Sequence, residues 1–308
     1  MHADEEILDT LSACFLHNGP GRVESLDNTF AHRIQLCRAW GLDALEPFHV
    51  LDVGCGQAES TAVLAYFAGE DGHATGLDPA EPSYGAPFTV QQSQDYLRQS
   101  SPLGPRITFA RRSLPEFLAT ANARSTVFDM AVFCHSLWYF TGSDAVHDHF
   151  VALAGAGIPR VCLAEYSTAS ADDDPAQRPH QLAARAQMRL HAAREQHLSE
   201  AKPSTLNVRG ALEVEELLRV AESAGWSVTR RGIVSPPAGM RDGYWEAGVV
   251  TSPRFREGII SQGLPKEQED SVLEFIPQIG QAIEHLKSIG EPVATMDVAW
   301  AVLERQPA

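Results

Sequence analysis

The sequence predicts an α/β protein: a doubly wound, mainly parallel sheet of seven strands with an N-terminal helical cap and lid insertions. Three observations lead to this fold class. Short apolar runs alternate with helical patterns along most of the chain. The first run is followed by two closely spaced glycines and a helix, and the second run ends on an acid. Strands separated by helices pair in parallel through right-handed crossovers, which favours one sheet with helices on both faces.

Residues 1–45 are expected to form the helical cap. In "FAHRIQLCRAWGL" Gly41 is a suitable helix terminator. The helical period brings four positions near one face: Phe30, Ile34, Cys37 and Leu42. These helices precede the first strand of the sheet. We expect the cap to help cover the ligand site.

Seven strands are expected after the cap. They are "FHVLDVG", "HATGLDP", "RITFARRS", "VFDMAVFCHSLWYF", "PRVCLAEYS", "WSVTRRGIV" and "TMDVAWAVLER". The intervening helices are "AESTAVLAYFAG", "PFTVQQSQDYLRQS", "LPEFLATA", "SDAVHDHFVALAGAG" and "LNVRGALEVEELLRVAESAGW". The fourth strand leaves the extended pattern at His135. The last strand is the one that can pair antiparallel with its neighbours.

Two segments interrupt the alternation of strands and helices. Residues 168–207 carry an acidic turn and a long polar helix, and residues 235–293 separate the last two strands, starting with a stretch rich in proline and glycine. Long connections inside a compact domain commonly cover a functional site. We interpret both segments as substrate-covering insertions within one domain that spans residues 1–308.

The composition limits the partners of the chain. Lys and Arg number 24 and Asp and Glu 40, giving a formal net charge of −16, so neither nucleic acid nor an anionic membrane would attract the chain. No apolar run approaches the roughly 18 residues of a membrane span. The five cysteines are not clustered, and "MHADEEILDTL" lacks the basic-then-apolar order of a signal peptide. We expect a cytoplasmic protein with reduced thiols; its oligomeric state stays open, with a homodimer as one option.

The stretch "HVLDVGCGQAESTAVLA" carries the main functional signal. Asp52 lies near the end of a hydrophobic strand, and Gly54-Cys55-Gly56 exposes the backbone just before a helix. Ligands of doubly wound sheets lie beyond the carboxyl ends of the strands, where glycines allow close approach and helix N-termini offer free N–H donors. Asp78 ends the second strand, where a carboxylate commonly binds a ribose diol.

Two cofactors that contain ribose compete for this turn. The NAD fingerprint has a third glycine or alanine where this chain has Glu59, and the carboxylates of Asp52 and Asp78 would repel a pyrophosphate. S-adenosylmethionine (SAM) carries an ammonium, a sulfonium, a ribose for Asp78 and a single carboxylate. The residues therefore favour SAM over NAD.

The motifs also resemble those of a known family. "VLDVGCGQA", then "ATGLDPA" and later "FDMAVFCHSLWYF" resemble class I SAM-dependent methyltransferases, specifically the UbiE-like branch that acts on small molecules. With "HRIQLCRAWGL" and "YGAPFTVQQSQ" added, the chain is similar to a group associated with microbial, especially fungal, secondary metabolism. The resemblance covers residues 28–168 well and the last three elements loosely. It implies the Rossmann-like class I methyltransferase fold, with SAM as the cofactor.

The resemblance further implies contacts with the cofactor. The residues that match its cofactor-binding positions are Asp52, Gly54, Cys55, Gly56, the ribose acid Asp78, and Pro79 against the adenine. Ala58 stands at the usual third glycine. The third strand ends in "ARRSLPEF", without the family's acid for the adenine amino group, so Ser113 or the backbone takes that role. The Cys55 side chain is expected to be a small filler, because nothing basic nearby lowers its pKa.

The cluster "CHSLWYF" supplies candidates for the acceptor side of the site. His135 could be a general base, a hydrogen-bonding partner of the cofactor or a packed core histidine. An imidazole has a suitable pKa for taking a proton from a phenol or an ammonium near neutral pH. Trp138, Tyr139 and Phe140 are expected in the pocket wall, where aromatic faces attract a sulfonium or an amine. Tyr139 is also a second candidate base.

Later segments add further candidates. Glu165 and Tyr166 end the fifth strand, where they could orient the acceptor or form a salt bridge at the rim, and Glu165 is another candidate base. Trp245, in "GMRDGYWE", is placed to close the pocket from the far side. No metal site is expected, because His147 and His149 of "HDHF" point to different faces of a helix.

The sequence thus predicts an enzyme that transfers a methyl group from SAM to O, N or S of a small, aromatic or heterocyclic metabolite. Its main requirements are to align the acceptor with the methyl carbon and the sulfur, and to exclude water. Two alternatives stay open. One is an enzyme of the same fold that uses bound SAM for a non-methylating cyclisation or decarboxylation, and the other is a SAM-binding partner without catalysis. The fold alone does not name the acceptor atom.

Overall fold

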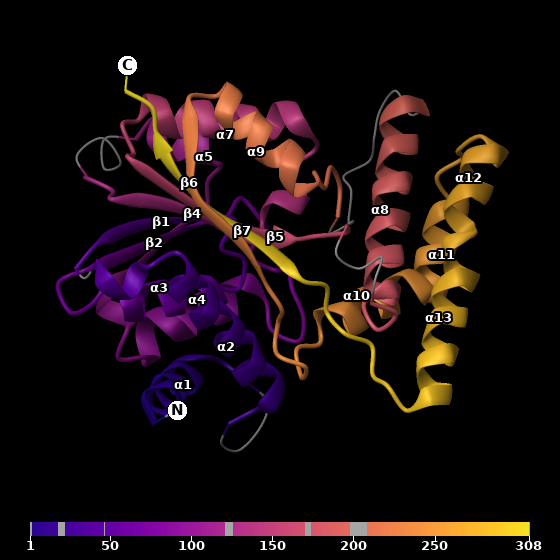
Figure 1. Ribbon diagram of the computed structural model, residues 1–308, viewed down its shortest axis with the longest axis horizontal. Coiled ribbons are helices and arrows are strands. Elements are labelled where there is room, and N and C mark those ends of the chain that lie inside the picture. The colour runs from indigo at the N-terminus through magenta and orange to yellow at the C-terminus, as the bar shows by residue number, and fades with distance from the viewer. Residues whose placement is uncertain are drawn as a thin grey trace.

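The computed structural model describes residues 2–17, 22–45, 47–120, 126–169, 174–197 and 208–307. Its centre is one seven-stranded sheet in the order β3-β2-β1-β4-β5-β7-β6 (Figure 1). The strands are β1 (His49–Val53), β2 (His73–Leu77), β3 (Ile107–Ala110), β4 (Met130–Cys134), β5 (Arg160–Tyr166), β6 (Trp226–Val234) and β7 (Val298–Arg305). β7 is antiparallel to β5 and β6, and the other neighbours are parallel. All seven predicted strands and the antiparallel last strand are confirmed.

The strand order reverses between β1 and β4. These two strands are parallel neighbours, with Asp52 opposite Val132, so the loops that follow them start side by side. The Ser136 hydroxyl, just beyond β4, donates a hydrogen bond to the carbonyl oxygen of Val53 at the end of β1 (2.7 Å). Ligands of doubly wound sheets bind at such a reversal. The topology therefore places the site beyond the carboxyl ends of β1 and β4.

Helices cover both faces of the sheet (Figure 1). One face packs against α1 (His2–Cys14), α2 (Glu24–Ala39), α3 (Glu59–Phe67) and α4 (Val90–Ser100). The other packs against α5 (Leu114–Leu118), α7 (Ser143–Gly155) and α9 (Val214–Ser223). In β1, Val50 lies in the first core and Leu51 in the second, because successive side chains of a strand point to opposite faces.

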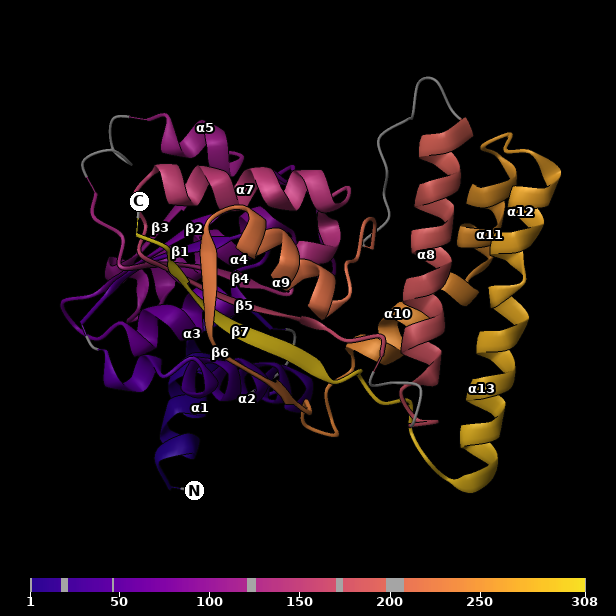
Figure 2. The ribbon, with the colours of Figure 1, turned by 45° about the horizontal axis from the view of Figure 1, so that its top comes forward.

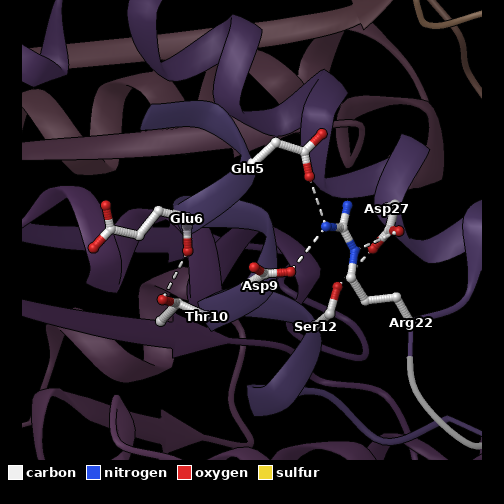
Figure 3. A network of polar contacts seen from close by, with 7 residues as sticks. All are labelled: Glu5, Glu6, Asp9, Thr10, Ser12, Arg22 and Asp27. Atoms are coloured by element: carbon white, nitrogen blue, oxygen red, sulfur yellow. Dashed lines mark hydrogen bonds and ion pairs between the residues drawn. The ribbon is translucent and has the colours of Figure 1, made fainter. Parts of the chain in front are cut away.

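A network of charged side chains joins α1 to α2 (Figure 3). The guanidinium of Arg22 donates to Glu5 and Asp9 of α1 (2.8 and 2.9 Å) and to Asp27 of α2 (2.9 Å). The Ser12 hydroxyl donates to the same Asp27 carboxylate (2.6 Å). The predicted N-terminal cap is therefore part of the helical layer on one face of the sheet.

The two predicted insertions fold together into a helical bundle beside the sheet (Figures 1 and 2). Its helices are α8 (Arg178–His197), α10 (Asp242–Thr251), α11 (Pro253–Ile260), α12 (Lys266–Leu273) and α13 (Phe275–Ile289). The bundle has a core of its own, which includes the buried side chains of Leu190, Val250 and Ile279. Its role as a substrate cover stays a prediction. Among the described residues, none of the helices is long and apolar enough to cross a membrane.

The helix that follows the first insertion is shorter than the sequence predicts. The prediction began at residue 206, which lies outside the described residues, whereas α9 begins at Val214. The backbone N–H groups of Arg209 and Gly210 instead donate to the carbonyl oxygens of Trp138 and Phe140 (2.8 and 2.9 Å). These long-range hydrogen bonds hold the segment, which bends at Arg209 and Gly210, against the loop after β4.

Candidate active site

The turn after β1 contains three residues in the left-handed region of backbone conformation: Gly54 (φ 78°), Gly56 (φ 50°) and Ala58 (φ 80°). A Cβ atom at Gly54 would lie 2.5 Å from the Cβ of Ser136, so the neighbouring loop excludes any side chain there. A Cβ atom at Gly56 would meet no heavy atom within 4 Å. The first glycine is therefore required by packing, and the second borders open space.

Asp78 lies directly beside this open space. One oxygen of its carboxylate accepts a hydrogen bond from the backbone N–H of Gly56 (2.7 Å), and the other accepts from the N–H of Ala80 (2.8 Å). Each oxygen keeps a further lone pair, so the carboxylate can still accept hydrogen bonds from a diol. Pro79 is exposed next to it. The structure thus brings the predicted ribose acid and the glycine turn together.

Asp52 lies beneath the turn and is almost fully buried. Its Oδ2 atom accepts hydrogen bonds from the hydroxyls of Ser60 and Thr61 (2.7 and 2.6 Å), in the first turn of α3. Its Oδ1 atom is buried and has no hydrogen-bonding partner among the described residues. Burial raises the pKa of this carboxyl to about 6, although both hydroxyls oppose the shift. Asp52 fastens α3 to β1, and its predicted contact with the cofactor stays a prediction.

Two further predicted cofactor residues have local roles in the fold. The Cys55 thiol is buried, and burial raises its pKa well above the usual value. The backbone N–H and the hydroxyl of Ser113 both donate to Glu116 (2.9 and 2.7 Å), which caps the N-terminus of α5 after β3. A contact between Ser113 and adenine is a prediction that these hydrogen bonds leave open.

His135 follows β4 in the left-handed conformation (φ 56°), and its side chain is 7% exposed. Its Nε2 atom lies 3.0 Å from Nε2 of His32, on α2. Its Nδ1 atom lies 3.7 Å from Oε1 of Glu165 and has no hydrogen-bonding partner among the described residues. Burial, then the charge of Arg33, holds the pKa of His135 well below its usual value. Both ring nitrogens of His135 therefore face other protein groups.

Glu165, at the end of β5, organises the loop after β4. Its Oε2 atom accepts hydrogen bonds from the backbone N–H groups of Leu137 and Trp138 (3.0 and 3.2 Å), and Oε1 accepts from that of Tyr166 (3.0 Å). Burial raises the pKa of this carboxyl to about 7. Glu165 thus caps the short helix η3 (Leu137–Tyr139) and fixes the direction in which its aromatic side chains point.

The aromatic candidates lie between the sheet and the helical bundle. The ring of Tyr166 packs on His135 and Trp138, with centroids 4.4 and 5.3 Å apart. Its hydroxyl donates to Asp242, the first residue of α10 (2.5 Å). Trp138 is 5% exposed, whereas Tyr139 is 43% exposed. The first two rings therefore join sheet to bundle, and Tyr139 is the more open of the predicted pocket residues.

The helical bundle contributes polar side chains next to these aromatic residues. Glu246 of α10 accepts a hydrogen bond from Gln187 of α8. Desolvation by the surrounding protein, followed by the influence of Tyr84 and Glu246, raises the pKa of the Tyr139 phenol. Tyr84 and Glu246 are therefore within electrostatic range of the Tyr139 phenol. Trp245 is 51% exposed on α10, and its predicted closing role stays a prediction.

Sequence reasoning missed two charged residues at this edge of the sheet. Arg33 of α2 has its Nε and Nη1 atoms buried without a hydrogen-bonding partner among the described residues. Glu59 is the first residue of α3, directly after the glycine turn, and burial raises its pKa. One signal could have revealed Arg33: it sits inside "FAHRIQLC", next to the apolar positions Phe30 and Ile34 that face the core.

The comparisons with known proteins agree with the fold and with the geometry of the site. No family model matches the chain. Methyltransferases phomM' and phomM of Diaporthe leptostromiformis are each 35% identical over 350 aligned positions, covering 98% of this chain and 90% of each relative. The crystal structure of a cyclopropane-fatty-acyl-phospholipid synthase-like protein from Lactobacillus casei has a TM-score of 0.79 and 26% identity, covering 97% of this chain and 99% of that one. The chain belongs to the family of these fungal methyltransferases and is a class I, SAM-dependent methyltransferase.

Proposed function

We propose that the enzyme methylates O, N or S of a small aromatic or heterocyclic acceptor, bound between the ends of β4 and β5 and the helical bundle. One observation carries the proposal: Trp138, Tyr139 and Tyr166 gather at this edge, and Tyr139 is half exposed there. Aromatic side chains bind planar rings by stacking and attract cationic centres. A small-molecule acceptor fits a site of this kind better than a macromolecule.

The residues around the glycine turn fit the cofactor. A Cβ atom at Gly56 would meet nothing within 4 Å, so a ligand can lie against that backbone. Asp78, which accepts from the Gly56 N–H, has lone pairs left for the ribose hydroxyls. SAM supplies an activated methyl group when bound. We assign ribose binding to Asp78 and close backbone contact to Gly56.

The acceptor side is assigned from the atoms that are free to meet a substrate. His135 has both ring nitrogens facing protein groups, and Glu165 has both carboxylate oxygens on backbone amides. We therefore propose that these two residues position the loop after β4 and take no proton themselves. Tyr139 is proposed to contact the acceptor, and Tyr166 to fix the acceptor wall through its hydrogen bond to Asp242. Alignment and exclusion of water then account for most of the rate.

The proposal is tested by mass spectrometry of the protein incubated with SAM and a panel of phenols, indoles, thiols and cyclic dipeptides. The expected result is that one acceptor class gains the mass of a methyl group in place of a hydrogen. S-adenosylhomocysteine should form in an amount equal to that of the methylated product. Tyr139→Ala should raise KM for that acceptor and leave SAM affinity unchanged. An acceptor that isomerises or loses CO₂ while SAM is not consumed would overturn the proposal in favour of the non-methylating alternative.

A further inference from the structure

The guanidinium of Arg33 is a buried charge whose hydrogen bonds are incomplete. It belongs to α2 and is within electrostatic range of Cys134 and Tyr166, at the carboxyl ends of β4 and β5. Its Nε and Nη1 atoms lack hydrogen-bonding partners among the described residues. Burial opposes its charge, yet Cys134, Tyr166, Asp242 and Glu59 together keep its pKa above the ordinary value. A buried charge without hydrogen bonds is costly. A ligand that completed these hydrogen bonds would remove this cost.

Glu59 carries the opposite charge and is within electrostatic range of Arg33. It begins α3, so it lies one residue beyond the left-handed Ala58 that ends the glycine turn. Burial is the main cause of its raised pKa, and the charge of Arg33 opposes that shift. The two side chains thus influence each other electrostatically, although Nε and Nη1 of Arg33 remain without a hydrogen bond. A cation and an anion near one another suit the carboxylate and the ammonium of a zwitterion.

We infer that Arg33 and Glu59 bind the amino-acid end of the cofactor, with Arg33 on its carboxylate and Glu59 on its ammonium. The inference rests on the proposed binding of SAM at the turn between Gly56 and Asp78. The planar fork of a guanidinium matches a carboxylate in a bidentate pair. The ribose end of one ligand would then meet Asp78, and its amino-acid end would meet Arg33 and Glu59.

This arrangement explains why α2 belongs to the site. The next residue along the chain from His32, which contacts His135, is Arg33. One turn of α2 therefore supports the loop after β4 with one side chain and completes the cofactor pocket with the next. The N-terminal segment acts here as a wall of the pocket.

The test compares two nucleosides by calorimetry on the full chain: S-adenosylhomocysteine, which has the amino-acid end, and 5′-methylthioadenosine, which lacks it. The wild-type protein should bind the first more tightly. Arg33→Met should weaken binding of S-adenosylhomocysteine by roughly 100-fold and leave that of 5′-methylthioadenosine unchanged, as expected for lost hydrogen bonds to a charged group. Glu59→Gln should weaken only the first nucleoside, by roughly 10-fold. The matched control is Arg38→Met, which replaces an exposed arginine of the same helix. This variant should bind both nucleosides as tightly as the wild-type protein.

Each other outcome has a distinct meaning. Equal losses for both nucleosides in Arg33→Met would make Arg33 structural and overturn the inference. No loss for either, with a raised KM for the acceptor, would assign Arg33 to an anionic acceptor and overturn it as well. If Arg33→Met does not fold, Arg33→Lys keeps the charge without the fork, and the same selective loss is expected at smaller size. A wild-type protein that binds neither nucleoside would contradict the proposed cofactor site itself.

Discussion

The two walls of the site are built from different kinds of contact. At the glycine turn, Asp78 reaches the N–H of Gly56 across 22 residues of sequence, and most of the partners are backbone groups. At the acceptor wall, His32 meets His135 across 103 residues, and Tyr166 meets Asp242 across 76. In these two contacts, side chains of separate elements meet each other. The first wall thus depends mainly on the backbone conformation of the turn, and the second mainly on contacts between side chains.

This difference indicates which wall can be changed by substitution without disturbing the other. Backbone contacts depend on φ angles and on the absence of side chains, so the cofactor wall tolerates little change in residue type. Side-chain contacts between distant elements can be exchanged one at a time without changing the path of the chain. We expect substitutions at the acceptor wall to change the choice of acceptor, and substitutions at the turn to abolish binding or folding.

The largest expected effects come from two glycines of the same turn: one substitution should mainly reduce stability, and the other should mainly reduce SAM affinity. Gly54→Ala places a Cβ atom 2.5 Å from that of Ser136, and we expect a loss of about 3 kcal/mol or failure to fold. Gly56→Ala meets no heavy atom within 4 Å and should cost about 1 kcal/mol through its left-handed backbone. Its methyl group would occupy the cofactor space, so SAM affinity should fall by roughly 100-fold. Urea unfolding and calorimetry measure the two effects, and equal loss of stability in both variants would contradict the assignment.

A smaller effect is expected on the acceptor wall. Tyr166→Phe keeps the ring that packs on His135 and removes the hydrogen bond to Asp242. We expect kcat/KM for the acceptor to fall roughly 10-fold, which corresponds to one lost hydrogen bond to a charged group. SAM affinity should stay the same. Tyr96→Phe, on α4, is the matched control and should change neither quantity. A drop in SAM affinity in Tyr166→Phe would show that the two walls are not independent.

The sequence was sufficient for the sheet, since its strands were bounded by glycines and helices with strong periodicity. It was not sufficient for α9, where the segment containing Gly210 pairs with the loop after β4 in place of forming a helical turn. A Cβ atom at Gly210 would lie 2.4 Å from the backbone N of Gly142, so this close approach depends on a distant loop. Helical periodicity carries no information about such a contact.

The candidate site divides in the same way. Asp78 and Gly56 could be found because each belongs to a short motif at the end of one of the first two strands, and these strands are parallel neighbours. The sequence left three roles open for His135, because nothing in "CHSLWYF" indicates that His32 would occupy its Nε2 atom. Likewise, the sequence left two roles open for Glu165, which could orient an acceptor or form a salt bridge at the rim. Its three backbone partners became visible only in the folded chain.

Glu165 also predicts a dependence of stability on pH. Its carboxyl has an ordinary pKa of 4.5 and a pKa of about 7 in the fold. Between these values the folded state keeps the proton and the unfolded state loses it, so its contribution to stability falls as pH rises from about 4.5 to about 7. The full difference is on the order of 3 kcal/mol.

The measurement is the free energy of unfolding of wild type and Glu165→Gln across this pH range. The variant should be less stable at pH 4.5, because an amide cannot accept all three backbone hydrogen bonds. The gap between the two proteins should narrow as pH rises. His32 and His180, whose pKa values burial lowers to about 3, act in the opposite direction but contribute equally to both proteins. A gap that does not change with pH would contradict the raised pKa of Glu165.

The smallest expected effect lies outside both walls, in the network that joins α1 to α2. Arg22→Ala removes contacts to Glu5, Asp9 and Asp27, but the first two carboxylates are 67% and 66% exposed, and only Asp27 is mostly buried. Exposed ion pairs each contribute little, so we expect a loss of about 1 kcal/mol at low salt and less at high salt. SAM affinity and kcat should be unchanged, because α2 is held to α3 by the apolar core that contains Phe30 and Leu36. If calorimetry instead finds weaker SAM binding in Arg22→Ala, then the position of α2, and with it Arg33, depends on α1, and the cofactor wall extends to the N-terminal helix.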